Sequence, residues 1–208
     1  MLIALLGPTA SGKTHLAVEL AYTLGGEIIS ADSRQLYRRM DIGTGKDLSE
    51  YVYNDITIPY HLIDIYEPGE QCNLFAYQQM FYNVYNQLSA SHTPMILCGG
   101  SGMYAEAILR NYQLASVAPD IDLREKLEKL SDAELTEILA AHQTLHNSTD
   151  TSSRKRLIRA VEIALASPTK TAVQPQDIES LIFAIDDTVP KKCVSFKIQN
   201  FEKVKTKN

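Results

Sequence analysis

The sequence predicts an α/β fold in which a parallel sheet is flanked by helices and carries a small helical insertion. Short, wholly apolar runs recur in the first half of the chain, as expected of strands buried on both faces. Several of these runs lead through a loop into an amphipathic helical pattern. Repeated strand–loop–helix units of this kind build parallel sheets with helices on both faces.

The first elements have the clearest boundaries. Leu2–Leu6 is wholly apolar and predicts a buried strand that ends at Gly7 and Pro8. Over Lys13–Leu24 the apolar residues share one helical face, and two glycines follow. Glu27–Ser30 predicts the next strand. A further strand is expected near residues 60–65, a helix capped by Asn73 over residues 74–88, and a buried strand over residues 94–98.

The second half of the chain changes in character. After a glycine-rich turn and a helix ending near Arg110, residues 131–134 form a capping box that opens a helix to about residue 141. A second helix is predicted over residues 152–166, with an apolar stripe of Leu157, Ile158, Val161 and Leu165. We therefore divide the chain into an α/β core (1–111), a helical insertion (112–179), a strand returning to the core (180–187) and a basic tail (188–208) that we expect to be poorly ordered.

Composition excludes several classes of protein. The chain has 208 residues, of which 45% are hydrophobic and 22% charged, as in an ordinary globular protein. No apolar run approaches the roughly 18 residues that span a membrane, and the apolar start is too short for a signal peptide. The 3 cysteines are scattered, which favours reduced thiols in a cytoplasmic protein over a metal site.

Charge is distributed unevenly. The formal net charge is −5, but residues 189–208 hold six lysines and one acid, a local +5, so the rest of the chain carries −10. A chain whose larger part is this acidic is not expected to bind nucleic acids non-specifically. Any RNA or DNA binding must come from local basic patches.

Residues 7–14, here called the P-loop, match the pattern G-x-x-x-x-G-K-[ST] completely. The loop lies between a predicted strand and a predicted helix, as a phosphate-binding loop requires, which makes the fold P-loop NTPase-like. Its glycines let backbone N–H groups surround a phosphate at the helix N-terminus. Lys13 is expected to pair with the phosphates and the Thr14 hydroxyl to bind Mg²⁺. The motif predicts a di- or triphosphate ligand but no particular reaction.

Two further polar residues follow predicted strands. Asp32 comes at the carboxyl end of the second strand, where open parallel sheets bind ligands. It suits either a metal-binding or proton-accepting carboxylate, or a helix cap or turn residue. Ser101 lies in the glycine-rich loop after residues 94–98. Its hydroxyl suits either a donor to a leaving-group oxygen or the cap of the next helix.

A basic cluster marks the start of the predicted helix at 152–166. It contains Arg154, Lys155, Arg156 and Arg159, and Lys155, Arg159 and Glu162 lie opposite the apolar stripe. A solvated helix face explains such a pattern. Within an acidic body, the cluster is also the strongest candidate for contacts with a nucleic-acid backbone, together with Arg34, Arg38 and Arg39.

Several ordered motifs resemble one family, the tRNA dimethylallyltransferases, also called tRNA isopentenyltransferases or IPP transferases. They are GPTASGKT at 7–14, ISADSRQLY at 29–37, MDIGTGK at 40–46, HLID at 61–64, GGSGMY at 99–104 and the stretch 145–162. The resemblance spans about residues 2–185. The string from DSRQ to MDIGT is far more specific than the P-loop alone.

The resemblance implies a role for each motif. The P-loop would hold the pyrophosphate of dimethylallyl diphosphate through Gly7, Pro8, Thr9, Ala10, Ser11, Gly12, Lys13 and Thr14. The prenyl group would pass to the exocyclic N6 amine of the adenosine 3′ of the tRNA anticodon, with Asp32 as general base. Ser101 stands where the family usually has threonine and would contact the oxygen between the prenyl carbon and the diphosphate. The tRNA would be contacted by Asp32, Ser33, Arg34, Gln35, Ser101, Arg124, Lys155, Arg156, Leu157, Ile158 and Arg159.

The resemblance also implies a C-terminal region with further helices and a catalytic arginine near the diphosphate. This chain diverges after residue 186 and has no arginine beyond Arg159, so we expect it to lack that region, with Lys191 or Lys192 as the nearest substitutes. The partners expected are dimethylallyl diphosphate and the tRNA anticodon stem-loop, with Mg²⁺ as cofactor, no membrane and a monomeric state. The alternatives are a P-loop kinase of nucleotides or small molecules, an adenylate isopentenyltransferase, and an inactive, truncated tRNA-binding remnant.

Overall fold

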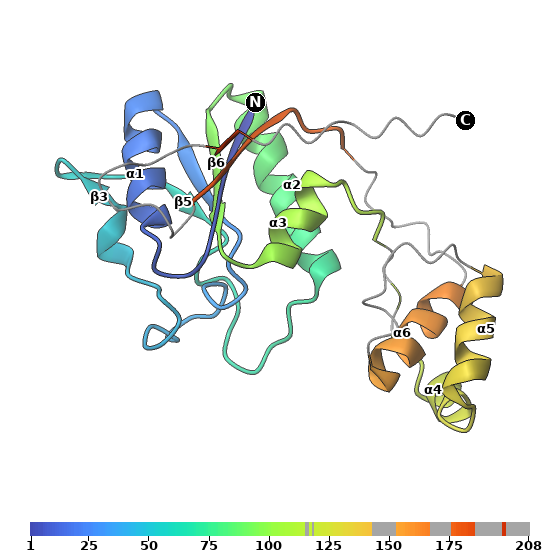
Figure 1. The fold of residues 1–208 in the computed structure, drawn as a ribbon. Coiled ribbons are helices and arrows are strands. Elements are labelled where there is room, and N and C mark those ends of the chain that lie inside the picture. Colours follow the sequence, from blue (N-terminus) through green and yellow to red (C-terminus); the bar gives the residue numbers. More distant parts are fainter. Residues whose placement is uncertain (115–116, 118, 143–152, 167–175, 186–196, 199–208) are drawn as a thin grey trace. The chain divides into compact units, whose positions relative to one another are not determined.

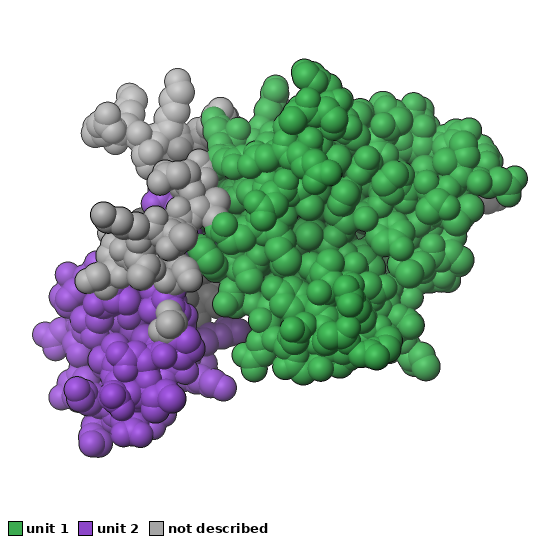
Figure 2. Space-filling view, turned by 180° about the vertical axis from the view of Figure 1, so that it is seen from behind, with its two compact units in different colours: residues 1–112, 175–208 green, residues 113–174 purple. Residues whose placement is uncertain are grey.

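The computed structural model describes residues 1–114, 117, 119–142, 153–166, 176–185 and 197–198 (Figure 1). The chain forms two compact units, which Figure 2 colours separately: unit 1 is Met1–Tyr112 with Pro175–Asn208, and unit 2 is Gln113–Gln174. Unit 2 covers most of the predicted insertion at 112–179, although the division into domains stays a prediction. No helix in the described part of the chain is both long and apolar enough to cross a membrane.

Unit 1 is built on a six-stranded sheet in the order β5-β2-β6-β1-β7-β8. Its strands are β1 (Leu2–Leu6), β2 (Glu27–Ser30), β5 (Tyr60–His61), β6 (Met95–Gly99), β7 (Ser180–Ala184) and β8 (Lys197–Ile198). All neighbouring strands are parallel except β7 and β8, which are antiparallel. This mostly parallel sheet, flanked by helices, confirms the predicted α/β fold.

Helices cover both faces of the sheet: α1 (Lys13–Leu24) lies on one side, and α2 (Leu74–Ala90) and α3 (Gly102–Leu109) lie on the other (Figure 1). Helices can pack on both faces because successive side chains along a strand point to opposite faces of the sheet. Ile3 and Leu5 of β1 belong to the buried cluster that α1 joins through Ala17 and Val18. On α2, the hydroxyl of the fully buried Tyr77 donates to the Ser30 carbonyl at 3.0 Å, which fixes this helix at the end of β2.

The segment between β2 and α2 differs most from its prediction. The strand expected over residues 60–65 stops at His61, because Leu62 and Asp64 adopt left-handed backbone conformations with φ of 61° and 55°. A 3₁₀ helix, η1 (Leu48–Tyr51), and a short antiparallel pair, β3 (Val52–Tyr53) and β4 (Ile56–Thr57), were not predicted. The turn of that pair is Asn54 and Asp55, both with positive φ. Its sequence lacks the Asn-Gly or Asp-Gly signal that announces most such hairpins.

Unit 2 is a small helical unit of α4 (Ile121–Leu127), α5 (Asp132–His142) and α6 (Arg154–Leu165). The predicted capping box is present: the Ser131 N–H donates to Glu134 Oε2 at 2.7 Å, and the Glu134 N–H donates to Ser131 Oγ at 3.3 Å. The core contains Leu127, Leu135, Leu139, Leu157, Ile158 and Val161. The prediction that Leu165 belongs to this stripe is wrong, because it lies in the last turn of α6 and is 39% exposed.

The basic tail predicted at 188–208 lies outside the described residues, apart from the two residues of β8. These two pair with Phe183 and Ala184 at the end of β7. The expectation that the tail is poorly ordered therefore stays a prediction.

Candidate active site

Three loops meet at the carboxyl edge of the sheet in unit 1. They follow β1, β2 and β6, and parallel strands place such loops along one edge. The β2 and β6 loops touch closely: a Cβ atom at Gly99 would lie 2.3 Å from the Ala31 carbonyl oxygen, so only glycine fits there. The Ala31 N–H donates to the Cys98 carbonyl at 2.8 Å, and the Ser101 N–H donates to the Ala31 carbonyl at 3.2 Å.

The P-loop bends sharply into α1. Gly12 adopts a left-handed conformation with φ of 82° directly before Lys13, the first residue of the helix. The Lys13 side chain folds over the loop, where its ammonium donates to the Pro8 carbonyl and to Ser11 Oγ. Only 8% of this residue is exposed. A buried cation at a helix N-terminus, wrapped by glycine-rich backbone, is suited to hold an anion.

Lys13 also lies beside the β6 loop. A Cβ atom at Gly100 would lie 3.9 Å from Lys13 Nζ and 3.7 Å from Thr9 Oγ1. At the other side of the loop, a Cβ atom at Gly7 would lie 2.9 Å from the Ile185 carbonyl oxygen, directly after β7. The P-loop therefore lies between the ends of β6 and β7, and the approach at Gly7 is too close for any residue with a Cβ atom.

Asp32 lies in the loop after β2 and is partly buried. Its Oδ1 atom accepts a hydrogen bond of 2.9 Å from the Arg34 N–H, so the side chain does form the turn that was one interpretation of this residue. Among the described residues, no other hydrogen bond to this carboxylate is present. The second oxygen is therefore available to accept a proton or a metal, and the turn holds the group in one orientation.

The Ser101 hydroxyl connects two of the loops. It accepts from the Ser33 N–H at 3.0 Å and donates to Ser33 Oγ at 3.2 Å. Ser101 is the residue before α3, but its side chain makes no capping hydrogen bond, so the structure does not support the alternative that it serves as a helix cap. The hydroxyl instead lies in the site, next to the turn that holds Asp32.

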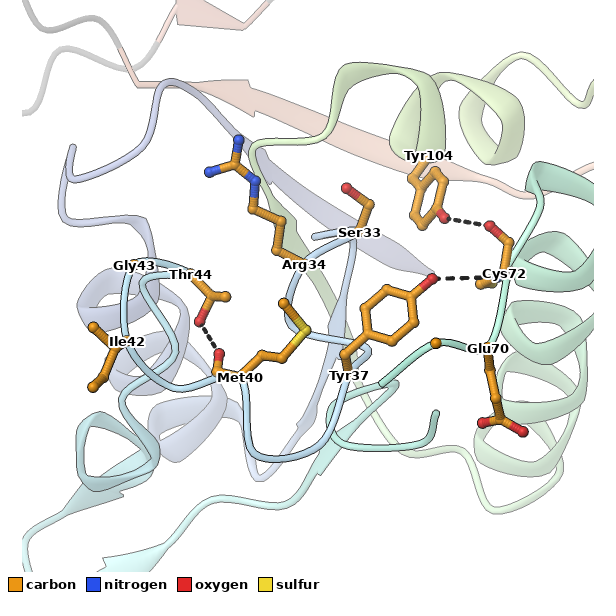
Figure 3. A pocket seen from close by; sticks show the side chains of 11 residues that line it. Ser33, Arg34, Tyr37, Met40, Ile42, Gly43, Thr44, Glu70, Cys72 and Tyr104 are labelled. Atoms are coloured by element: carbon orange, nitrogen blue, oxygen red, sulfur yellow. Dashed lines mark hydrogen bonds between the residues drawn. The ribbon is translucent and has the colours of Figure 1, made fainter. Parts of the chain in front are cut away.

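A cavity of about 230 Å³ unites these groups. It is lined by Thr9 of the P-loop, Gly100 and Ser101 of the β6 loop, Asp32, Ser33 and Arg34 of the β2 loop, and Gly43 and Thr44. A larger cavity of about 630 Å³ shares Ser33, Arg34, Gly43 and Thr44 with it. In Figure 3, Met40, Ile42 and Thr44 lie on one side of this larger cavity, and Cys72 and Tyr104 lie on the other.

Sequence reasoning missed part of this lining. Tyr37, Met40, Gly43 and Thr44 belong to the strings that carried the family resemblance, but no chemistry was assigned to them. They lie in irregular loops, where neither helical nor strand periodicity gives a signal. The Tyr37 hydroxyl accepts from the Cys72 N–H at 3.3 Å, a contact between distant segments that a sequence pattern does not reveal (Figure 3).

The predicted RNA contacts in unit 1 fall into two groups. Ser33 and Arg34 line both cavities, and Arg34 is exposed. Gln35 is partly buried, and its side chain accepts from the Ser30 hydroxyl at 3.0 Å. Arg38 and Arg39 both pair with Glu67. Of these basic residues, Arg34 therefore offers its charge to the cavities most directly.

The remaining predicted RNA contacts lie in unit 2. Lys155 and Arg156 are exposed on the first turn of α6, whereas Leu157 and Ile158 are buried in the core of the unit. Arg154 donates to Asp132 and to the carbonyls of Glu128 and Leu130, which ties α6 to α5 and the turn before it. Leu157 and Ile158 thus hold the helix in the core of unit 2. A direct contact between these two residues and RNA stays a prediction.

The burial of Glu162 shows that the polar face of α6 is not simply solvated, as the sequence pattern had suggested. Its side chain is 1% exposed and accepts from Arg124 Nε at 3.0 Å, Arg124 Nη2 at 2.8 Å, the Asp120 N–H at 2.6 Å and Arg159. Arg159 also donates to the Val117 carbonyl at 2.7 Å. Arg124 and Arg159 are therefore first of all the partners of a buried carboxylate, and each keeps about a third of its side chain exposed.

We expect Glu162→Gln to lower the free energy of unfolding of unit 2 by about 3 kcal/mol at pH 7. Burial alone would raise the pKa of this carboxyl, but the hydrogen bonds from Arg124 and Arg159 lower it from 4.5 to about 2. A depressed folded-state pKa stabilises the protein above pH 4.5, and this contribution is lost as the pH falls toward 2. Denaturant unfolding between pH 2 and 7 measures it. Glu137→Gln, at an exposed position of α5, is the control and should leave the profile unchanged.

A loop with the P-loop pattern that joins a parallel strand to the N-terminus of α1, at the carboxyl edge of the sheet, defines a P-loop fold. The family model described as IPP transferase matches residues 35–200. The chain is 54% identical over 188 residues to "tRNA dimethylallyltransferase 1" of Porphyromonas gingivalis and 52% identical over 187 residues to "tRNA dimethylallyltransferase 2" of Phocaeicola vulgatus. The chain belongs to the IPP transferase family.

Each of these two matches covers 89% of the chain but only 62% and 61% of the relative, so the chain spans about three fifths of their length. Among solved structures, a tRNA isopentenylpyrophosphate transferase of Staphylococcus epidermidis aligns with a TM-score of 0.53 at 27% identity, covering 89% of this chain and 63% of that one. A eukaryotic dimethylallyltransferase described as acting on tRNA aligns with a TM-score of 0.68 at 19% identity, covering 88% and 47%. The second likeness shows the fold alone.

Proposed function

We propose that this chain transfers a dimethylallyl group from dimethylallyl diphosphate to the N6 amine of the adenosine 3′ of the anticodon in tRNA. The observation that carries the proposal is the small cavity, in which Thr9 of the P-loop, Asp32 and Ser101 meet. The names of the relatives, tRNA dimethylallyltransferases, support the same reaction. We further propose that the protein acts as a monomer in the cytoplasm, without a membrane partner.

The reaction needs charge stabilisation and one proton acceptor. The bond between the allylic carbon and the diphosphate oxygen breaks, and the diphosphate leaves with the electron pair. The adenine N6 forms the new bond to that carbon and gives up a proton, which Asp32 accepts. The Lys13 ammonium and the P-loop N–H groups stabilise the negative charge that builds on the diphosphate. The Ser101 hydroxyl has one proton, which it would turn from Ser33 Oγ to the bridging oxygen when the diphosphate is bound.

A divalent metal fits the donor set of the P-loop. Mg²⁺ prefers oxygen ligands and usually takes only one or two from protein, with phosphates and water supplying the rest. Thr14 in the first turn of α1 offers a hydroxyl that bonds to none of the described residues. Among those residues, no three His, Cys, Asp or Glu side chains gather to hold a metal by themselves. We propose that Thr14 holds Mg²⁺ on the diphosphate, where the ion would neutralise charge on the leaving group.

The acceptor must reach the cavity as a single unstacked base. Enzymes that modify a base extrude it from its stack into a pocket. Ser33 and Arg34 line both cavities and are suited to contact the RNA there, with Gln35 behind them. In unit 2 the exposed Lys155 and Arg156 are suited to phosphate contacts, as are the exposed edges of Arg124 and Arg159.

A transfer assay with labelled dimethylallyl diphosphate tests the proposal. The chain is incubated with anticodon stem-loop RNA, with AMP, or without acceptor, in the presence of Mg²⁺. Label on the stem-loop RNA, lost when the target adenosine is replaced by inosine, supports the proposal. Label on AMP instead would indicate an adenylate isopentenyltransferase, phosphate transfer from ATP a kinase, and diphosphate or RNA binding without product an inactive remnant.

We expect Ser101→Ala to lower the rate of transfer by about 10²-fold, because one donor to the leaving oxygen is removed. Ser101→Thr keeps the hydroxyl and should stay within about threefold of the parent rate. Single-turnover rates at saturating diphosphate measure both variants. A Ser101→Ala rate equal to that of the parent would show that this hydroxyl only holds the Ser33 turn.

A further inference from the structure

Lys46 is a charged residue buried next to the cavities, and the proposed reaction does not use it. Its side chain is 1% exposed. The ammonium donates to the Tyr37 carbonyl at 2.9 Å, pairs with Asp41 Oδ1 at 2.7 Å, and also donates to Asp64 Oδ1. A lysine ammonium has three donors, so all of them are used. A buried charge persists only when it is paired in this way.

The environment keeps Lys46 charged. Burial by itself lowers the pKa of a lysine, but the hydrogen bonds and negative charges of Asp41 and Asp64 outweigh it and raise the pKa above 10.5. Lys46 therefore acts as a permanent cation at neutral pH. It does not act as a proton donor or acceptor.

The partners of Lys46 bracket one loop, residues 40–45, here called the 40–45 loop. Tyr37 lies before the loop, and Asp41 lies within it. Asp64 follows β5, and its N–H donates to the Gln35 carbonyl at 3.0 Å. Inside the loop, Thr44 Oγ1 donates to the Met40 carbonyl at 2.5 Å. The side-chain amide of Gln35 reaches the Gly45 carbonyl at 3.5 Å. The loop is thus tied to the β2 loop and to the segment after β5.

The 40–45 loop forms a wall of both cavities. Gly43 and Thr44 line the small cavity with Asp32 and Ser101, and Met40 and Ile42 line the large one (Figure 3). Gly43 and Gly45 adopt positive φ values of 78° and 68°, so the backbone alone does not hold this loop in one shape. Among the described hydrogen bonds, none joins the loop to the P-loop.

We propose that Lys46 is a positioning residue that holds the 40–45 loop as the wall on the acceptor side of the site. The proposal rests on the proposed function and adds a specificity for one substrate: Lys46 sets the affinity for the RNA acceptor and not that for the diphosphate. Lys46 touches neither substrate. It acts through the loop, which it keeps in the shape that the two cavities require.

Hydrogen exchange tests the structural half of the proposal without any activity. In Lys46→Met, we expect the amides of residues 46 and 64, which donate to Thr44 Oγ1 and to the Gln35 carbonyl, to exchange about 10-fold faster or more, while those of α1 keep the parent rate. Lys129→Met, at an exposed position in unit 2, is the matched control and should change neither. Unchanged exchange at residues 46 and 64 of Lys46→Met would overturn the proposal.

Kinetics test the functional half. We expect Lys46→Met to raise the apparent KM for stem-loop RNA about 10-fold, with the Kd for the diphosphate within about twofold of the parent. A variant that is only less stable would lower the concentration of active protein. It would change neither the KM for the RNA nor the Kd for the diphosphate. An equal loss of diphosphate affinity would therefore overturn the proposal. If the parent chain transfers nothing to RNA, the proposed function fails, while the exchange comparison still decides the role of Lys46.

Asp64→Asn provides a milder variant should Lys46→Met fail to fold. It keeps the shape of the side chain but removes one of the two charges paired with Lys46, and Asp64 lines neither cavity. We expect the same pattern at smaller size, with faster exchange of the Lys46 amide and a KM for RNA raised about threefold. Parent-like values in both measurements would contradict the proposal.

Discussion

Asp32→Asn is expected to lower the rate of prenyl transfer by about 10³-fold and to leave the diphosphate affinity within about twofold of the parent value. The reason is geometric and chemical. The asparagine Oδ1 still accepts the Arg34 N–H, so the turn after β2 is preserved. The amide accepts no proton from the adenine amine, however, and the step that Asp32 assists loses its base. Single-turnover transfer and calorimetric binding of the diphosphate separate the two quantities.

Asp55→Asn is the matched control for Asp32, because Asp55 is exposed in the turn between β3 and β4. It should retain the parent rate. Asp32→Ala removes the turn as well as the base and should be at least as slow as Asp32→Asn. A transfer rate for Asp32→Asn within about threefold of the parent rate would show that the base has been assigned to the wrong residue.

Lys13→Met is expected to weaken diphosphate binding and to lower the transfer rate at saturation, each by about 10²-fold or more. Lys13 is the buried cation of the P-loop, held at the start of α1 where the helix dipole also attracts an anion. The diphosphate gains charge as it leaves, so the lost ammonium affects the transition state as well as the bound substrate. Methionine keeps much of the volume and removes the charge.

Diphosphate titration and single-turnover rates measure the effect of Lys13→Met. The exposed Lys126 provides the control, since Lys126→Met removes the same charge in unit 2. Parent-like diphosphate affinity in Lys13→Met would mean that residues 7–14 do not hold the anion. The proposal would then lose its basis at the P-loop, whatever the behaviour of Asp32.

The sequence predicts the first strand, the P-loop and the first helix with the same bounds that the structure shows, because motif and periodicity agree there. Asp32 and Ser101 were found for a topological reason: both follow buried parallel strands, whose carboxyl ends share one edge. The bond from the Ser33 N–H to Ser101 Oγ joins residues 68 positions apart, and no local pattern reveals it.

The rest depends on pairings between distant residues. The 40–45 loop has no period, and its shape follows from Lys46 meeting Asp41 and Asp64. Glu162 and Arg159 have helical spacing, but the second partner of the buried Glu162 carboxylate, Arg124, comes from another helix. A sequence pattern assigns charged residues to solvent by default, and it fails where charges neutralise each other inside the protein. Lys191 and Lys192, the predicted substitutes for a C-terminal arginine, lie outside the described residues.

The most direct measurement is a crystal structure of this chain with Mg²⁺ and a thiolodiphosphate analogue of dimethylallyl diphosphate, which resists ionisation. The account predicts that the diphosphate lies against the N–H groups of residues 7–14 with Lys13 Nζ on its oxygens, and that the allylic carbon faces Asp32 across the small cavity. A diphosphate bound away from residues 7–14, or an Asp32 carboxylate turned out of the cavity that holds the allyl group, would contradict it.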